Sequence, residues 1–183
     1  MSKKPIILKK TTIATSRLFH IESLDIQFSN GEQRNYERLA RSSSNSAVLI
    51  VPMVDTETVL LIREYSAGVH RYELGLPKGR TELGESFLDA ANRELKEEVG
   101  YGAKNLHHLS SFSIAPSYLE HMTEIVIAED LYIEKLEGDE PEELEVIPWK
   151  LNNINALLAT GECTEARSIA ALFMALEYFK GRH

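Results

Sequence analysis

The chain has 183 residues, of which 43% are hydrophobic and 26% are charged. This profile is typical of one folded domain with a short extension, and it excludes a chain that is disordered throughout. The formal net charge is −8 and no basic stripe offsets it, which argues against nucleic acid or an anionic membrane as a partner.

The sequence carries no signal for a membrane or for secretion. No apolar run approaches the roughly 20 residues that are needed to cross a bilayer. The apolar stretch Ile6-Ile7-Leu8 near the start is too short for the core of a signal peptide. The single cysteine, Cys163, can form neither an internal disulfide nor a cysteine metal cage. We therefore expect a cytoplasmic protein.

The first part of the chain is expected to be a small antiparallel sheet. Apolar and polar residues alternate over 18–28, Ser29-Asn30-Gly31 is a turn signal, and a second run follows over 32–39. This predicts a hairpin with a preceding strand. So few strands cannot bury an apolar face alone, so we expect the segment to build a homodimer.

A polar run at 41–46 predicts a boundary between an N-terminal β segment, 1–43, and a second domain, 44–183. In that domain, elements of both kinds mix without a strict alternation, which predicts an α/β fold with a mixed sheet between helices. The expected strands are 47–54 and 59–63, both buried on two faces, then 106–114, 124–131 and 146–149, the last at a sheet edge because of Pro148, and the expected helices are 85–99, 153–160 and 165–180, the last capped by Thr164.

The helix expected at 85–99 carries three unusual carboxylates. On a helical wheel, Glu94, Glu97 and Glu98 lie beside the apolar arc instead of on the solvated face. Their i, i+3, i+4 spacing brings them together on one edge of the helix. Partly buried carboxylates in such proximity are costly unless something neutralises them, and Mg²⁺ or Mn²⁺ does so with oxygen ligands. An ordinary solvated acidic patch is the alternative.

The segment from Gly79 to Tyr101 resembles the Nudix box. Gly79, Glu85 and the run from Arg93 to Tyr101 match the box at every defined position. This resemblance implies a Nudix α/β/α sandwich with a mixed sheet, preceded here by the small antiparallel β segment. It also implies a Mg²⁺-dependent hydrolase that cleaves a nucleoside diphosphate linked to another group.

The resemblance also implies roles for single residues. Glu94 and Glu98 would be metal ligands, and Glu97 would be a ligand or a partner held through water. The carbonyl of Lys78 is a further ligand in many family members. Arg93 would hold Glu85 and orient the acidic cluster.

Other parts of the chain are similar to the group of Nudix enzymes that contains bacterial ADP-compounds hydrolases and ADP-ribose pyrophosphatases. Pro116 stands where ADP-ribose pyrophosphatases carry a proline, and Tyr118 lies near it, where dinucleoside polyphosphate hydrolases often carry a tyrosine. Both residues are expected to contact substrate. The group accepts ADP-ribose, diadenosine polyphosphates and NADH, and releases AMP. ADP-ribose pyrophosphatases usually carry a glutamate four residues before the box glycine, where this chain has Gly75; the nearest acid is Glu73.

Residues 136–145 carry six acids and no Lys or Arg. In ADP-ribose-type enzymes a mobile loop at this place supplies the glutamate that acts on the attacking water. The resemblance puts Glu140 at that position, with Glu142 next to it as the alternative base. Composition alone is also compatible with an ordinary solvated loop.

Three further residues are candidates for substrate binding. Arg63 and Arg71 flank the strands before the box and could each bind a phosphate, and Tyr36 could stack on adenine across a dimer interface. Two other functions stay open: a Nudix domain that senses a nucleotide without cleaving it, and a Nudix hydrolase that acts on nucleoside triphosphates or capped RNA. The complete carboxylate set argues against the sensor, and the near balance of charge outside 136–145 argues against long RNA.

Overall fold

The computed structural model describes residues 3–41 and 47–182. The contacts within the described part of the chain separate into two compact units. The first contains 3–41 together with 113–122, and the second contains the other described residues. The domain boundary expected at 43/44 falls outside the described residues and stays a prediction.

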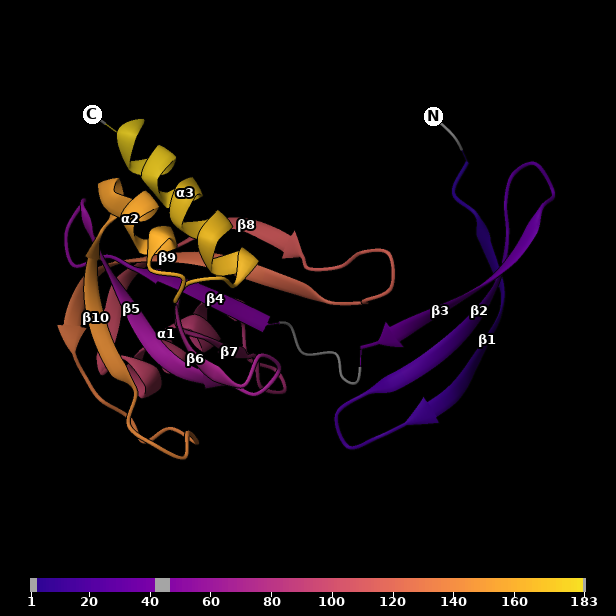
Figure 1. The fold of residues 1–183 in the computed structure, drawn as a ribbon, viewed down its shortest axis with the longest axis horizontal. Helices are drawn as coiled ribbons and strands as arrows, with labels where there is room; N and C mark the ends of the chain where they lie inside the picture. The colour runs from indigo at the N-terminus through magenta and orange to yellow at the C-terminus, as the bar shows by residue number, and fades with distance from the viewer. Residues whose placement is uncertain (1–2, 42–46, 183) are drawn as a thin grey trace. The chain divides into compact units, whose positions relative to one another are not determined.

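The first unit is a three-stranded antiparallel sheet in the order β1-β2-β3 (Figure 1). It confirms the expected antiparallel β segment. The β2–β3 turn contains Gly31, whose φ of 85° lies in the left-handed region that glycine adopts without strain. The strands are β1 (Ile6–Thr15), whose bounds the pattern did not predict, β2 (His20–Gln27) and β3 (Gln33–Ala40).

The segment 113–122 belongs to the first unit because it pairs with β3. The amide of Leu39 donates to the carbonyl of Tyr118 at 2.7 Å, and the amide of Glu120 donates to the carbonyl of Leu39 at 3.0 Å. The side chain of Arg38 forms an ion pair with Glu120 at 3.0 Å. Sequence patterns did not predict this pairing, since it joins residues that are far apart along the chain.

The second unit confirms the expected mixed sheet. One sheet has the order β7-β4-β9-β8, with β4 parallel to β9 and antiparallel to β7, and an antiparallel sheet has the order β10-β5-β6. The strands are β4 (Ala47–Pro52), β5 (Thr58–Ser66), β6 (Arg71–Gly75), β7 (Lys78–Arg80), β8 (Tyr101–Ser113), β9 (Met122–Ile133) and β10 (Glu145–Lys150).

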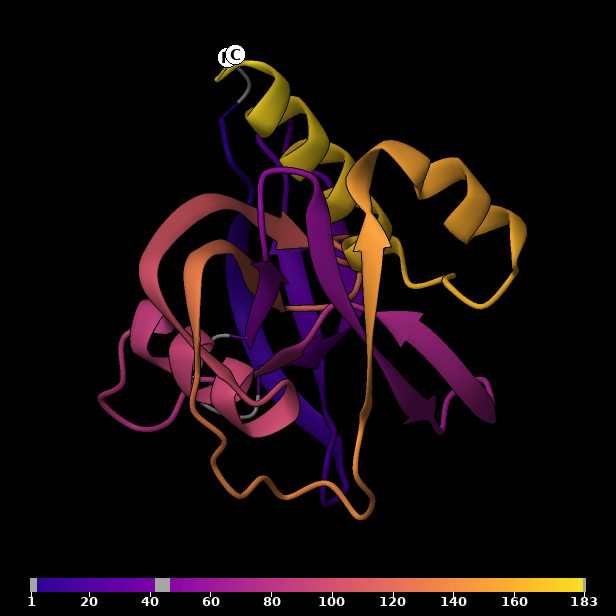
Figure 2. The same ribbon diagram turned by 90° about the vertical axis from the view of Figure 1, so that its left-hand side faces the viewer.

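The helices of the second unit cover the sheets from two sides (Figures 1 and 2). Neighbouring residues of β4 alternate between two core clusters: Leu49 packs in the cluster of α3, and Ile50 packs in the cluster of α1. This explains the continuous apolar run of β4, because a strand between two helical layers is buried on both faces. The helices are α1 (Phe87–Glu98), α2 (Ile154–Ala159), which follows a 3₁₀ turn at Leu151–Asn153, and α3 (Ala166–Lys180).

Some local details correct the sequence-based expectations. The cap of α3 is Glu165, whose carboxylate accepts from the amide of Ser168, and not Thr164. The hydroxyl and amide of Thr164 donate instead to the buried carboxylate of Glu73. The short strands β6 and β7 were not expected, because Gly75 and Pro77 interrupt any strand pattern there. The edge position of the strand with Pro148 is confirmed.

Among the described residues, no helix is long and apolar enough to cross a membrane.

Candidate active site

The helix α1 positions the carboxylates that the sequence singled out. Its start is set by Ser86, whose hydroxyl accepts from the amide of Asp89 at 3.2 Å. Its apolar face, with Ala91 and Leu95 fully buried, packs on the sheet core. This packing turns the side edge of the helix inward, so that Glu94 is only 9% exposed and Glu98 only 7% exposed.

The glycine of the box lies directly against one of these carboxylates. A Cβ built on Gly79 would lie 1.9 Å from the carboxyl carbon of Glu94 and 2.0 Å from its Oε1. No side chain fits at this position of β7 unless Glu94 moves. The strand therefore lies close to the helix, and the close approach depends on the missing side chain.

Arg93 holds the carboxylates together. Its Nε donates to Glu85 at 3.0 Å, and its Nη1 donates to both Glu94 and Glu97 at 2.9 Å. Its Nη2 donates to the carbonyl of Arg80 at 2.8 Å. One guanidinium thus joins the loop before α1, the strand β7 and two carboxylates of the helix. The prediction that Arg93 contacts Glu85 is confirmed.

Burial and charge shift the pKa values of this cluster in different directions. Burial raises the pKa of Glu98 to about 8, against the opposing effect of the amide of Lys78, which donates to its Oε2 at 2.9 Å. Burial also raises the pKa of Glu94, although Arg93 opposes it. Burial would raise the pKa of Glu85 too, but the hydrogen bond and charge of Arg93 and the amide of Glu82 together outweigh it, and the pKa is lowered. For Glu94 and Glu98, the positive and hydrogen-bonding groups in the described part of the chain thus do not offset the effect of burial.

These residues line one cleft of about 670 Å³. Its acidic side chains outnumber its basic ones by eight to three, so its charge disfavours an anionic pyrophosphate unless cations are bound. The acids come from β5, from the loop before α1, from α1 itself and from residues 136–145. They are Glu64, Glu82, Glu94, Glu97, Glu98, Glu137, Asp139 and Glu140, and the basic residues are Lys78, Arg80 and Arg93.

The donor set of the cleft fits a hard divalent cation. Such a cation takes carboxylate and carbonyl oxygens, and Glu94, Glu97 and Glu98 supply the former from one edge of α1. In the described part of the chain, no three His, Cys, Asp or Glu side chains already converge on one point. Two of the three α1 carboxylates, Glu94 and Glu97, accept from Nη1 of Arg93.

The loop between β9 and β10, residues 134–144, is called the acidic loop here. In Figure 2 it is the long orange loop that joins the two strands. Glu140 lines the cleft beside the α1 carboxylates. A Cβ built on Gly138 would lie 2.3 Å from Oε2 of Glu140 and 3.5 Å from Cβ of Glu97. Because Gly138 has no side chain, the acidic loop has room to hold the carboxylate of Glu140 beside Glu97 of α1.

Glu142, the alternative base, lies elsewhere. Within the described residues it is absent from the lining of this cleft, and its Oε1 accepts from the hydroxyl of Tyr72 at 2.7 Å. It lines an adjoining pocket of about 470 Å³, to which Glu97, Glu98 and Glu140 also contribute. The structure thus places Glu140, which the resemblance favoured, in the cleft of the α1 carboxylates, and it engages Glu142 with Tyr72.

The two arginines expected to bind phosphate are engaged with acids. Arg63 donates to Glu145 at 2.9 Å and to Glu162 at 3.2 Å. Arg71 forms an ion pair with the buried Glu73. Neither arginine lines the cleft of the box. The structure does not bring them to the α1 carboxylates. Glu73, the acid nearest to Gly75 in the sequence, is bound by Arg71 and Thr164.

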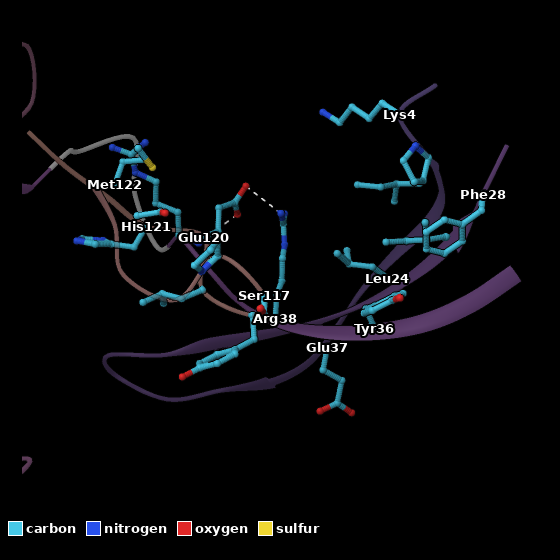
Figure 3. Close-up of a pocket in the computed structure, with 18 residues that line it drawn as sticks. Lys4, Leu24, Phe28, Tyr36, Glu37, Arg38, Ser117, Glu120, His121 and Met122 are labelled. Atoms are coloured by element: carbon cyan, nitrogen blue, oxygen red, sulfur yellow. Dashed lines mark hydrogen bonds and ion pairs between the residues drawn. The ribbon is translucent and has the colours of Figure 1, made fainter. Parts of the chain in front are cut away.

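Tyr36, Pro116 and Tyr118 lie together in the first unit. They line a pocket of about 600 Å³ between the sheet and the segment 113–122, where aromatic and aliphatic side chains surround the ion pair of Arg38 and Glu120 (Figure 3). Sequence reasoning did not predict that these three residues share a pocket.

Three residues of the site were missed by the sequence analysis. Glu64 lines the cleft and pairs with the ammonium of Lys78, Gly138 makes room for Glu140, and Tyr72 donates to Glu142. Only Gly138 carried a usable signal, because a lone glycine among acids marks a place where the backbone bends or approaches another group closely. The other two reach the site through pairing of β5 with β6 and β10.

Comparison with known protein families agrees with this geometry. A model of the NUDIX domain matches residues 44–173, and a model of the NudE-type Nudix hydrolase N-terminal domain matches residues 5–38. The chain belongs to the Nudix hydrolase family. The resemblance found in the box is thereby confirmed, and so is the assignment to a family of enzymes. Nudix hydrolases generally need a divalent metal ion.

Individual Nudix proteins resemble the chain over nearly its whole length. It is 51% identical to the ADP compounds hydrolase NudE of Escherichia coli (strain K12), over 98% of this chain and 96% of that one. It is 28% identical to an ADP-ribose pyrophosphatase of Bacillus subtilis (strain 168), over 90% and 91% of the two chains. A crystal structure of an ADP compounds hydrolase superposes with a TM-score of 0.91 at 50% identity, and covers 100% of this chain and 97% of that one.

Proposed function

We propose that this Nudix hydrolase cleaves the pyrophosphate of ADP-linked compounds, such as ADP-ribose, diadenosine polyphosphates and NADH, and releases AMP. The observation that carries the proposal is the buried pair Glu94 and Glu98 on one edge of α1, where Glu94 faces Gly79 of β7 and Glu98 accepts from the amide of Lys78. The similarity to proteins named ADP compounds hydrolase and ADP-ribose pyrophosphatase supports the choice of substrate class.

In this proposal Glu94, Glu98, Glu97 and the carbonyl of Lys78 hold Mg²⁺, with Mn²⁺ as a substitute. A bound divalent cation neutralises pyrophosphate oxygens and lowers the pKa of the attacking water. The chain contributes the alignment of the ligands: the amide of Lys78 orients Glu98, and Gly79 leaves room for Glu94. Arg93 keeps Glu97 and Glu94 on the side of the cleft.

Glu140 is the proposed base that takes a proton from the attacking water. Its carboxylate lines the same cleft and lies over Gly138 beside Glu97. A base must reach the water within hydrogen-bond distance, and of the two candidate glutamates it is Glu140 that lines the cleft. Water attacks a phosphorus atom, the bridging P–O bond breaks, and AMP leaves with the other phosphate, such as ribose 5-phosphate.

The remaining substrate contacts are also part of the proposal. Tyr36, Pro116 and Tyr118 offer an aromatic and apolar wall of the kind that an adenine ring fills. Arg63 and Arg71 can bind phosphate only if they leave Glu145, Glu162 and Glu73, so their role depends on that exchange.

A homodimer formed through the N-terminal sheet completes the proposal. The strand β1 lies at the edge of the three-stranded sheet and carries apolar side chains that are each about half exposed: Ile6, Ile7, Leu8 and Ile13. Apolar edge strands of this kind are usually covered. A second copy of the same chain can cover β1 through a symmetric interface. The cytoplasmic location expected from the sequence stays a prediction.

The test is a substrate panel with purified chain. ADP-ribose, diadenosine polyphosphates, NADH and nucleoside triphosphates are each incubated with Mg²⁺ or with a chelator, and the products are identified. We expect Mg²⁺-dependent release of AMP from the ADP-linked compounds. Turnover of triphosphates alone would replace the substrate class, and binding without any turnover would favour a sensor.

A further inference from the structure

Tyr72 makes a contact that the proposed chemistry does not use. It lies on β6, where it pairs with Tyr65 of β5, and its hydroxyl donates to Oε1 of Glu142 at 2.7 Å. The ring of Tyr72 meets the ring of Tyr65 edge to face, with centroids 5.8 Å apart. The hydroxyl is therefore held in place by a strand pair and a ring contact while it reaches across to the acidic loop.

The acidic loop is fastened at both of its ends. At its start, the amide of Leu136 donates to the carbonyl of Lys96 at 3.2 Å. At its end, Leu144 packs against the core cluster of α1. Between them, within the described residues, the bond to Tyr72 is the one side-chain hydrogen bond that joins residues 137–142 to another element.

The held residue is close to the proposed base along the chain. Glu142 and Glu140 are separated by Pro141 alone, whose ring fixes one backbone dihedral. A restraint on Glu142 therefore limits where Glu140 can lie. Glu140 needs such a limit, because its carboxylate enters the cleft past Gly138, where the backbone itself restrains little.

We propose that Tyr72 is a positioning residue: its hydroxyl holds Glu142 and thereby keeps the acidic loop in the conformation that presents Glu140 to the cleft. Glu142 is then the loop's attachment point and not its base. This inference rests on the proposed function for its effect on turnover. The attachment itself is a property of the free protein and can be measured without substrate.

The first experiment compares Tyr72→Phe with Tyr65→Phe. Each variant loses one hydroxyl and keeps its ring, but the hydroxyl of Tyr65 contacts His70 and not the acidic loop. With ADP-ribose and saturating Mg²⁺, we expect Tyr72→Phe to lower kcat by about tenfold, the scale of one hydrogen bond to a charged group, with KM changed less than about twofold. Tyr65→Phe should keep the wild-type kcat. Equal kcat values for all three proteins would overturn the proposal.

Hydrogen exchange of the free protein tests the attachment independently of turnover. The amides of 137–140 and 142 should exchange faster in Tyr72→Phe than in wild type, while those of α1 and α3 stay unchanged. Unchanged exchange in the loop overturns the attachment. If wild type hydrolyses no ADP-linked compound, the proposed function fails, and the exchange result still decides whether Tyr72 holds the loop.

Variants of Glu142 separate attachment from base catalysis. Glu142→Gln keeps an oxygen that accepts from Tyr72, so we expect at least a third of the wild-type kcat, whereas Glu142→Ala should match Tyr72→Phe. The double variant Tyr72→Phe with Glu142→Ala should lose no more than either single one, because both remove the same contact. A Glu142→Gln variant with kcat reduced by about 10²-fold would identify Glu142 as the base and overturn the proposal.

Discussion

The carboxylate of Glu94 lies in the space that the first side-chain atom at Gly79 would need, 1.9 Å from that position. The backbone of β7 therefore lies against a side chain of α1 at this point. This explains why β7 needs a glycine at this point: the reason is lack of space and not an unusual backbone angle.

Gly79→Ala should therefore impair the site more than the fold. Glu94 is a flexible side chain, so it can move away from the new methyl group, but it then leaves the position beside Arg93. We expect kcat to fall by about 10²-fold, the scale of a displaced catalytic group, with little change in melting temperature. Gly68→Ala is the matched control, because a Cβ at Gly68 meets no atom within 4 Å. Similar activity of the two variants would contradict the assignment.

Glu98→Gln should abolish turnover and preserve the fold. The change removes the charge that holds a cation and keeps the shape of a side chain that is only 7% exposed. A loss of at least about 10²-fold is expected, more than the loss of a ligand's hydrogen-bonding partner usually costs. Glu177→Gln, on the exposed side of α3, serves as control. Activity within a few-fold of wild type at saturating Mg²⁺ would exclude Glu98 as a metal ligand.

The raised pKa of Glu98 predicts how the stability of the metal-free protein depends on pH. Below the ordinary value of 4.5, the group is protonated in both the folded and the unfolded chain. Between 4.5 and about 8, the unfolded chain ionises while the folded chain keeps the proton, so the free energy of unfolding falls as pH rises. Above about 8 the contribution is level.

This dependence is measured by denaturant unfolding with a chelator present, from pH 5 to pH 9. Glu98→Gln cannot titrate, so its free energy of unfolding should fall less over this range than that of wild type. Because all other groups are shared, the difference between the two proteins isolates Glu98. Parallel curves for the two would show that Glu98 is ionised in the folded, metal-free chain.

Glu140→Gln should lower kcat by at least about 10²-fold, the usual scale for loss of a general base. Metal and substrate affinity should change little, because the α1 carboxylates are intact. Glu143→Gln is the control, since Glu143 is exposed and pairs with Lys135 at 2.5 Å outside the cleft. The assay uses ADP-ribose at several pH values. If the pH profiles of kcat for both variants stay close to wild type, the acidic loop is an ordinary solvated loop.

The N-terminal sheet should give the chain twice its 20.7 kDa mass in solution. Light scattering at micromolar concentration measures this directly. Replacing Ile7 and Ile13 of β1 by Thr keeps β-branched residues in the strand and removes apolar surface, so the dimer should weaken while the strand remains. A monomer mass for the unaltered chain would refute the homodimer.

The sequence by itself determined the family, the fold class and the carboxylates of α1. Each of these depends on local spacing: the box has fixed intervals, and the helical period alone places Glu94 and Glu98 at the edge of an apolar face. The buried strands β4 and β5 were also predicted, because a strand between two helical layers is apolar throughout.

Only the tertiary structure decided which loop glutamate enters the cleft. Glu140 and Glu142 have the same chemistry and lie two residues apart, so no local pattern ranks them, and only the family resemblance favoured Glu140. The choice depends on Tyr72, which is near Glu142 only because β6 pairs with β5 and β5 pairs with β10. Likewise, Tyr118 shares a pocket with Tyr36 only because 113–122 pairs with β3. Both contacts join segments that are distant in sequence and are brought together by sheet pairing. The apolar and polar pattern of a single strand does not show which strand it pairs with.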